Sequence, residues 1–207
     1  MKLTRRSKRF ITILLTAAMV IGSCFTVFAS EQTTTASGSY YEPTILVTVP
    51  GTATFYLNPA KVEISANDPD TGANVTLSGQ IASPAYVISS STNCALKAKV
   101  GIKNKASGVT LVASAPASGT SKWACVSFRM DSDKAKITSG STASVNKVLS
   151  DNEDTASYTL AKSDGSTPTK AYFGFNGTVA AEPDPAWKAT DAITTTLKFT
   201  FLPTATN

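Results

Sequence analysis

The chain has 207 residues, with 19 basic and 14 acidic side chains and no histidine. Without histidine, Ser-His-Asp and Cys-His catalysis and every histidine-ligated metal site are excluded. A pair of carboxylates could still hydrolyse a glycan, but nearly all the acidic residues lie in segments with turn composition. We therefore expect a protein that is not an enzyme, with no catalytic residue, no metal and no cofactor.

Residues 1–29 have the pattern of a secretory signal peptide. A positive segment is followed by a mostly apolar stretch, and Ala29 provides the small residue at a cleavage site. The alternative is an uncleaved membrane anchor, which the Thr, Gly and Ser residues within the stretch disfavour. We expect cleavage after Ala29 and a secreted, cell-surface-associated protein with no membrane segment. The positive segment contains Lys2, Arg5, Arg6, Lys8 and Arg9.

A lipid anchor is a less favoured alternative for the same segment. Ile21-Gly22-Ser23-Cys24 is similar to a lipobox, in which Cys24 would carry the lipid. The residues after Cys24 stay apolar, however, where a lipoprotein normally becomes polar.

Cleavage also changes the charge balance. Five of the 19 basic residues and none of the 14 acidic residues lie in the leader, so 14 of each remain. A net charge near zero removes the long-range attraction that phosphate backbones require, and we expect no nucleic-acid partner.

Residues 30–42 form a polar, Ser- and Thr-rich segment that we expect to be flexible. Residues 43–207 then contain short apolar or alternating runs separated by Pro, Gly, Asn and Asp, which is typical of an all-β domain. The predicted strands are 44–49, 54–57, 62–65, 74–81, 86–90, 94–103, 109–114, 123–130, 143–149, 157–161, 171–179 and 192–202.

Three of these runs alternate clearly between apolar and polar residues. Residues 192–202 place Ile193, Leu197, Phe199 and Phe201 on one face and mainly Thr on the other. Residues 94–103 and 171–179 alternate in the same way. One apolar face per strand is typical of antiparallel sheets that pack together, so we predict a two-sheet β-sandwich of the Ig-like or Greek-key type.

Two stretches leave alternatives open. Residues 131–156 are poorly patterned and could be a long exposed loop or a pair of weak edge strands. Asp68-Pro69-Asp70-Thr71-Gly72 has oxygen donors that could hold calcium, but the distal Glu of an EF-hand loop is missing. We favour a plain turn between two strands there.

Cys94 and Cys125 remain after cleavage and could form one disulfide in an oxidising compartment. The strand alternation places Cys94 with Leu96 and Ala98, whereas Cys125 alternates with Val126 and Phe128. If both apolar sets mark the core, the two thiols point to opposite sides unless a bulge intervenes. The sequence leaves both the bonded and the free state open.

Trp187 and Trp123 are the candidate residues for stacking on a glycan. Trp187 follows Asp184-Pro185 in a predicted loop, and Trp123 begins a predicted strand. A tryptophan that flanks a strand more often packs on the edge of the core, which is the reading we favour.

The layout resembles a loose group of secreted Gram-positive surface β-sandwiches, of the WxL-domain and camelysin/TasA-like kinds. The resemblance covers residues 43–207. The Trp-x-Leu signature is absent, since Lys188-Ala189 follow Trp187, so peptidoglycan binding does not carry over. The segments on which the resemblance is based are Val47-Thr48-Val49-Pro50, Phe55-Tyr56-Leu57-Asn58-Pro59, Gly79-Gln80-Ile81, residues 86–93, residues 173–178, Trp187 and the strand that ends at Leu202.

This resemblance implies a non-catalytic structural or adhesive role at the cell surface or in an extracellular matrix. We expect association with further copies of the chain by β-strand addition, or with a cell-wall or surface polymer. The alternative is a carbohydrate- or cell-wall-binding module.

Overall fold

The fold is known from a computed structural model, which describes residues 44–117, 121–138, 142–181 and 185–204. The predicted signal peptide, its alternative lipid site at Cys24 and the whole polar segment 30–42 lie outside these ranges. The compact unit that contains the described residues extends from Glu42 to Asn207. Among the described residues, no helix is long and apolar enough to cross a bilayer.

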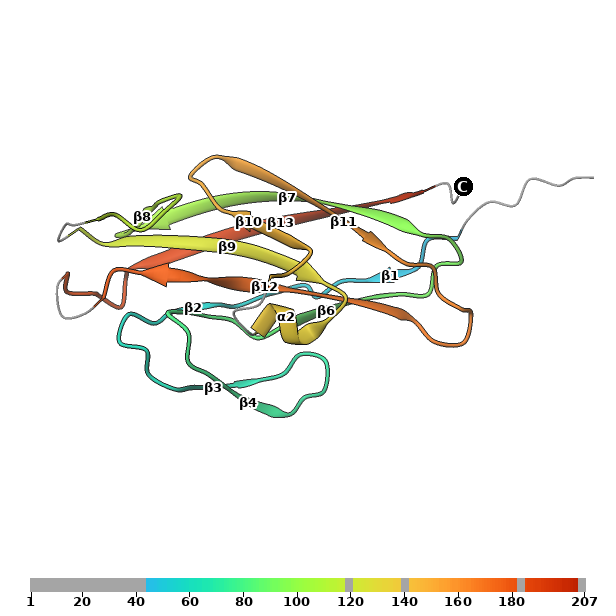
Figure 1. Ribbon diagram of the computed structural model, residues 1–207, viewed down its shortest axis with the longest axis horizontal. Helices are drawn as coiled ribbons and strands as arrows, with labels where there is room; N and C mark the ends of the chain where they lie inside the picture. The colour runs from blue at the N-terminus through green and yellow to red at the C-terminus, as the bar shows by residue number, and fades with distance from the viewer. Residues whose placement is uncertain (1–43, 118–120, 139–141, 182–184, 205–207) are drawn as a thin grey trace, which may run out of the picture. The chain divides into compact units, whose positions relative to one another are not determined.

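The regular structure of the described residues is mostly β-strand with almost no helix (Figure 1), which confirms the predicted all-β class. The strands are β1 (Val47–Thr48), β2 (Tyr56–Leu57), β3 (Ile64–Asn67), β4 (Asn74–Leu77), β5 (Ile81–Ala82), β6 (Tyr86–Ser90), β7 (Leu96–Ser107), β8 (Thr110–Leu111), β9 (Trp123–Asp131), β10 (Val145–Val148), β11 (Glu153–Leu160), β12 (Thr169–Val179) and β13 (Ala192–Pro203). The described residues also contain one short helix, α2 (Lys134–Thr138), which was not predicted.

The strands form two larger sheets and two small ones. The six-stranded sheet has the order β1-β6-β12-β9-β10, with β8 paired to β9 in parallel. The three-stranded sheet has the order β11-β7-β13, and β2-β5 and β3-β4 are separate pairs. All pairings other than β8–β9 are antiparallel.

One hydrophobic core receives side chains from both larger sheets. Phe128 and Phe173 of the six-stranded sheet are at most 1% exposed, as are Val100 and Ile102 of β7. At roughly 25 cal/mol per Å², burying one such side chain contributes about 1.5–3 kcal/mol. The alternation that predicted these strands therefore marks the sides that face this core.

The poorly patterned stretch 131–156 contains α2, β10 and the start of β11. β10 is at the end of the six-stranded sheet, and β11 is at one edge of the three-stranded sheet. Within this stretch, edge strands therefore account for residues 145–148 and 153–156, whereas residues 134–138 form the helix α2. The polarity of the strand residues is explained by their edge position, because an edge strand has fewer neighbours to cover it.

Candidate functional site

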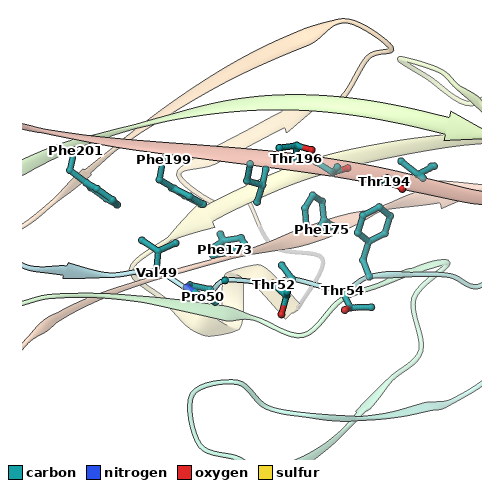
Figure 2. A pocket seen from close by; sticks show the side chains of 16 residues that line it. Val49, Pro50, Thr52, Thr54, Phe173, Phe175, Thr194, Thr196, Phe199 and Phe201 are labelled. Carbon is teal, nitrogen blue, oxygen red and sulfur yellow. The ribbon is translucent and has the colours of Figure 1, made fainter.

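A groove lined by aromatic, aliphatic and threonine residues lies between β13 and residues 49–55. Its volume is about 670 Å³, and Phe173 and Phe175 of β12 form its floor. Figure 2 shows Phe199 and Phe201 extending from β13 toward Val49 on the opposite wall. We refer to this feature as the β13 groove.

Strand β13 forms one wall of the groove and is an edge strand. Its residues pair with β7 from Ala192↔Ser107 to Pro203↔Leu96, and no described strand pairs with its other side. The inward side chains of Ile193, Leu197 and Phe199 are only half-buried. A 12-residue edge with an apolar face that is not fully covered is a template for pairing with another strand.

Aromatic rings connect this wall to the floor. The ring centroids of Phe199 and Phe173 are 5.4 Å apart, and those of Phe199 and Phe201 are 6.3 Å apart. Phe55 stacks at a tilt on Phe175 with centroids 4.5 Å apart. These distances lie within or near the range in which aromatic pairs attract each other, so the groove has a preformed apolar lining.

Residues 49–55 form the opposite wall and have no strand structure. One side chain anchors the backbone: the Tyr86 hydroxyl accepts from the Thr54 N–H at 2.5 Å and donates to the Thr54 carbonyl oxygen at 2.9 Å. The wall is therefore held at one point of its backbone and otherwise by Val49, Ala53 and Phe55, which pack against the core.

The lining determines what the groove can do chemically. Among the described residues that line it, none has an ionisable side chain, and the polar ones are all threonines. Such a lining offers no general acid, no general base and no metal ligand. It can bury apolar side chains of an extended segment while β13 offers backbone hydrogen bonds.

The two tryptophans singled out in the sequence lie outside this groove, near the end of β12. The Trp187 Nε1 donates to the Ala180 carbonyl oxygen at 3.0 Å, and the Ala180 N–H donates to the Trp123 carbonyl oxygen at 3.0 Å. Both side chains are half-buried, and Trp187 packs on the core. The indole N–H of Trp187 is thus used within the protein, which fits a residue at the edge of the core.

The two cysteines are free thiols and lie far apart. Cys94 lies just before the start of β7. Cys125 is in β9, two residues after Trp123, and Trp123 pairs with Thr110 just beyond the other end of β7. A strand of 12 residues is roughly 40 Å long. Joined cysteines have Cα atoms within about 7 Å, so the disulfide of the bonded alternative does not form within this fold. Burial raises the pKa of the Cys125 thiol.

The acidic segment 68–72 forms a turn between β3 and β4, as expected from its composition. Gly72 has a φ of 73°, and its N–H donates to the Asp68 carbonyl oxygen at 2.7 Å. The Asp68 carboxylate is bound by Lys134, and Asp70 is bound by the Lys170 Nζ at 2.7 Å. These ion pairs connect the β3–β4 hairpin to α2 and β12.

No group of three or more Cys, Asp or Glu residues that could hold a metal ion occurs in the described ranges. Comparisons with protein-family models, with curated proteins and with solved structures give no significant match for this chain. The alternation of residues 192–202 predicted which side chains of β13 face inward, but gave no sign that this face is partly open.

Proposed function

We propose that this chain is a non-enzymatic, secreted structural or adhesive protein of the cell surface or extracellular matrix. In this proposal, copies associate when an extended segment of one copy adds to β13 of another. The observation that carries the proposal is the β13 groove, which combines a backbone edge that no described strand pairs with and a half-exposed apolar face.

The same proposal includes the finer fold assignment. We propose that the six-stranded and three-stranded sheets are the two layers of a β-sandwich of the Ig-like or Greek-key type. The shared core supports this arrangement, since β7 contributes Val100 and Ile102 and the facing sheet contributes Phe128 and Phe173. An added strand would extend the three-stranded layer beyond β13.

Strand addition fits the dimensions and chemistry of the groove. β13 has 12 residues, which corresponds to an edge of roughly 40 Å. An incoming strand would satisfy backbone groups along this edge and place alternate side chains against Phe199 and Phe173. An uncovered edge of this length otherwise favours uncontrolled aggregation, so a defined occupant also protects the fold.

The proposed occupant is the segment that precedes the described residues in a second copy. Val47 and Thr48 cannot belong to this donor segment, because they form β1 and pair with Ser90 and Ser89 of β6. The donor is accordingly residues 30–43. These 14 residues can span about 45–50 Å when extended, enough to lie along β13. Thr33, Thr34, Thr35, Tyr40 and Tyr41 suit a strand.

Deletion of residues 30–43 tests the donor. Size-exclusion chromatography with light scattering should show oligomers or filaments for residues 30–207 and a folded monomer for residues 44–207. An unchanged oligomer in the shorter protein would reject this segment as the donor. If both proteins are monomers and only the shorter one is less stable, the segment covers β13 of its own copy, and assembly is rejected.

A matched pair of variants tests the acceptor. Leu197 is half-buried and lines the groove, whereas Thr200 on the same strand is exposed and does not line it. We expect L197K to prevent assembly, because an inward charge cannot be covered by the added strand. T200K adds the same charge on the other face and should assemble like the parent. Equal assembly of both variants would contradict the proposed groove.

The alternative carbohydrate-binding function depends on the two half-buried tryptophans close to Ala180. It predicts that W187A weakens glycan binding while the melting temperature stays constant. The packing of Trp187 on the core instead favours a loss of stability with no glycan affinity in the parent. Binding assays and thermal unfolding of the same variant distinguish the two outcomes.

A further inference from the structure

The outer face of the three-stranded sheet carries a row of lysines. On β7, Lys97, Lys99, Lys103 and Lys105 are all exposed, and they alternate with side chains that face the core. Successive lysines at i and i+2 are about 7 Å apart along a strand. The row is therefore regular over most of the length of β7.

The gap in this row is filled from the neighbouring strand. Gly101 occupies the position between Lys99 and Lys103, and its register partner on β13 is Lys198. A Cβ at Gly101 would lie 3.8 Å from the Cβ of Lys198, so this lysine stands directly beside the empty position. Together, Lys97, Lys99, Lys103, Lys105 and Lys198 form what we call the lysine face.

The flanking strands add hydroxyl groups and almost no negative charge. The outward residues of β13 that pair beside these lysines include Thr194, Thr196 and Thr200, and those of β11 include Ser157 and Thr159. Among the described residues of this face, the only acidic side chain is Glu153. Its carboxylate lies 3.4 Å from the Lys103 Nζ, and both side chains are more than 70% exposed.

The other acidic residues that offset the positive charge of the chain form ion pairs away from the lysine face. The remaining ion pairs of the described residues join Asp68, Asp70, Asp131, Asp154 and Asp191 to lysines outside the lysine face. The near-zero net charge after leader cleavage therefore conceals a separated distribution. A row of like charges about 7 Å apart repels itself and attracts a line of counter-charges.

We infer that the lysine face binds a linear, phosphate-bearing polymer of the cell surface. Lysine is a compact point charge with three donors and binds phosphate groups in proteins. Threonine and serine hydroxyls can donate to further phosphate oxygens. The face also lacks aromatic residues, which single-stranded nucleic-acid sites use to stack bases.

The choice of a surface polymer rests on the secreted location in the proposed function, but not on strand addition. The β13 groove uses the inward face of β13, and the lysine face uses the outward one. Both sites can therefore be occupied in the same molecule. Strand addition would place further copies of the lysine face side by side and increase avidity.

The test measures binding of synthetic poly(glycerol phosphate) to residues 30–207 by isothermal titration calorimetry across a salt series. L197K serves as the background, so that one copy is measured without avidity. For five lysines, log K should fall with log salt with a slope of roughly −3 to −4. A neutral glycerol oligomer should not bind.

Two triple variants locate the site. K97Q/K99Q/K198Q should weaken binding roughly tenfold or more at low salt and reduce the salt slope by about two. The matched control K61Q/K162Q/K188Q removes three exposed lysines from loops and should stay within about twofold of the parent. Thermal unfolding checks that both triple variants fold.

Three results would overturn the inference: no binding of the polymer, equal losses in the two triple variants, or tighter binding of single-stranded DNA of equal charge. Failure of assembly together with polymer binding would reject strand addition and leave this inference standing. Assembly without polymer binding would reject the polymer-binding inference and leave strand addition standing.

Discussion

Two aromatic pairs with the same spacing have different surroundings in this molecule. Phe173 and Phe175 of β12 are 1% and 3% exposed, with β6 and β9 on either side of their strand. Phe199 and Phe201 of β13 show the same alternation but are only half-buried, since no described strand covers the outer edge of β13. Alternation thus determines which way a side chain points, and the neighbouring strands determine how well it is covered.

The largest expected effect comes from truncating one member of each pair. F173A should lower the free energy of unfolding by about 3–5 kcal/mol, because it leaves a cavity in the closed part of the core. F199A should cost only about 1–2 kcal/mol in the monomer, since its ring is already partly hydrated. Urea unfolding of both variants measures the difference, and equal losses would mean that β13 is as well covered as β12.

Glycines on the two sheets give the next comparison. Gly177 of β12 has a φ of 151°, and an added Cβ would lie 1.9 Å from the Cys125 carbonyl oxygen. G177A should therefore cost about 3 kcal/mol or prevent folding. G101A on β7 meets only ordinary contacts and should change stability by less than about 0.5 kcal/mol. Thermal unfolding distinguishes the two, and a neutral G177A would show that β12 can shift.

A buried carboxylate gives a smaller and pH-dependent effect. Asp131 at the end of β9 accepts from the Ser144 N–H at 2.7 Å and from its hydroxyl at 2.6 Å. Burial alone would raise its pKa, but hydrogen bonds from Ser144 and Asp133 and the charge of Lys136 outweigh burial and hold the pKa well below its ordinary value.

A lowered folded-state pKa stabilises the protein above the unfolded value of about 3.9, and this contribution is lost as the pH falls below it. We expect D131N to cost about 2–3 kcal/mol at neutral pH. The difference from the parent should shrink as the pH falls from 5 to 2. Chemical unfolding at several pH values checks this, and a constant difference would show that the charge of Asp131 does not matter.

The smallest effect concerns the lysine face. The Lys103–Glu153 pair is highly exposed, so E153Q should change stability by less than about 0.5 kcal/mol. It should nevertheless tighten poly(glycerol phosphate) binding about twofold to fivefold, because it removes the only acidic side chain of the described lysine face. Weaker binding in this variant would contradict the charge argument.

Much of the strand layout could be predicted from alternation, and for β6 the predicted and observed bounds agree. β7 continues to Ser107, beyond its predicted end at residue 103. The prediction ended too early because Asn104 interrupts the series of apolar residues on the inward face. Its amide nitrogen donates to the Ser150 carbonyl oxygen at 2.8 Å, and its amide oxygen accepts from the Thr195 hydroxyl. A buried polar residue with such partners is tolerated, but the partners are distant in sequence and could not be foreseen.

The lysine face and the β13 groove both depend on which strands pair and in which register. The alternation of Lys97, Lys99 and Lys103 was visible in the sequence, whereas the position of Lys198 beside Gly101 follows only from the pairing of β7 with β13. In the same way, the groove exists because β13 is an edge strand. Single-sequence patterns report the local face of a strand and contain no information on which strands become neighbours.

The pairing of β7 also has a consequence for the order of folding. Its two neighbours follow it late in the chain: Leu96 pairs with Leu160 of β11 and with Pro203 of β13. Closing such long loops costs chain entropy before any contact forms, which makes folding slow. If the chain emerges from the ribosome or a translocation channel with its N-terminus first, β7 stays unpaired until residues 153–203 follow. The three-stranded sheet, and with it the shared core, would therefore form only after residues 153–203 have emerged.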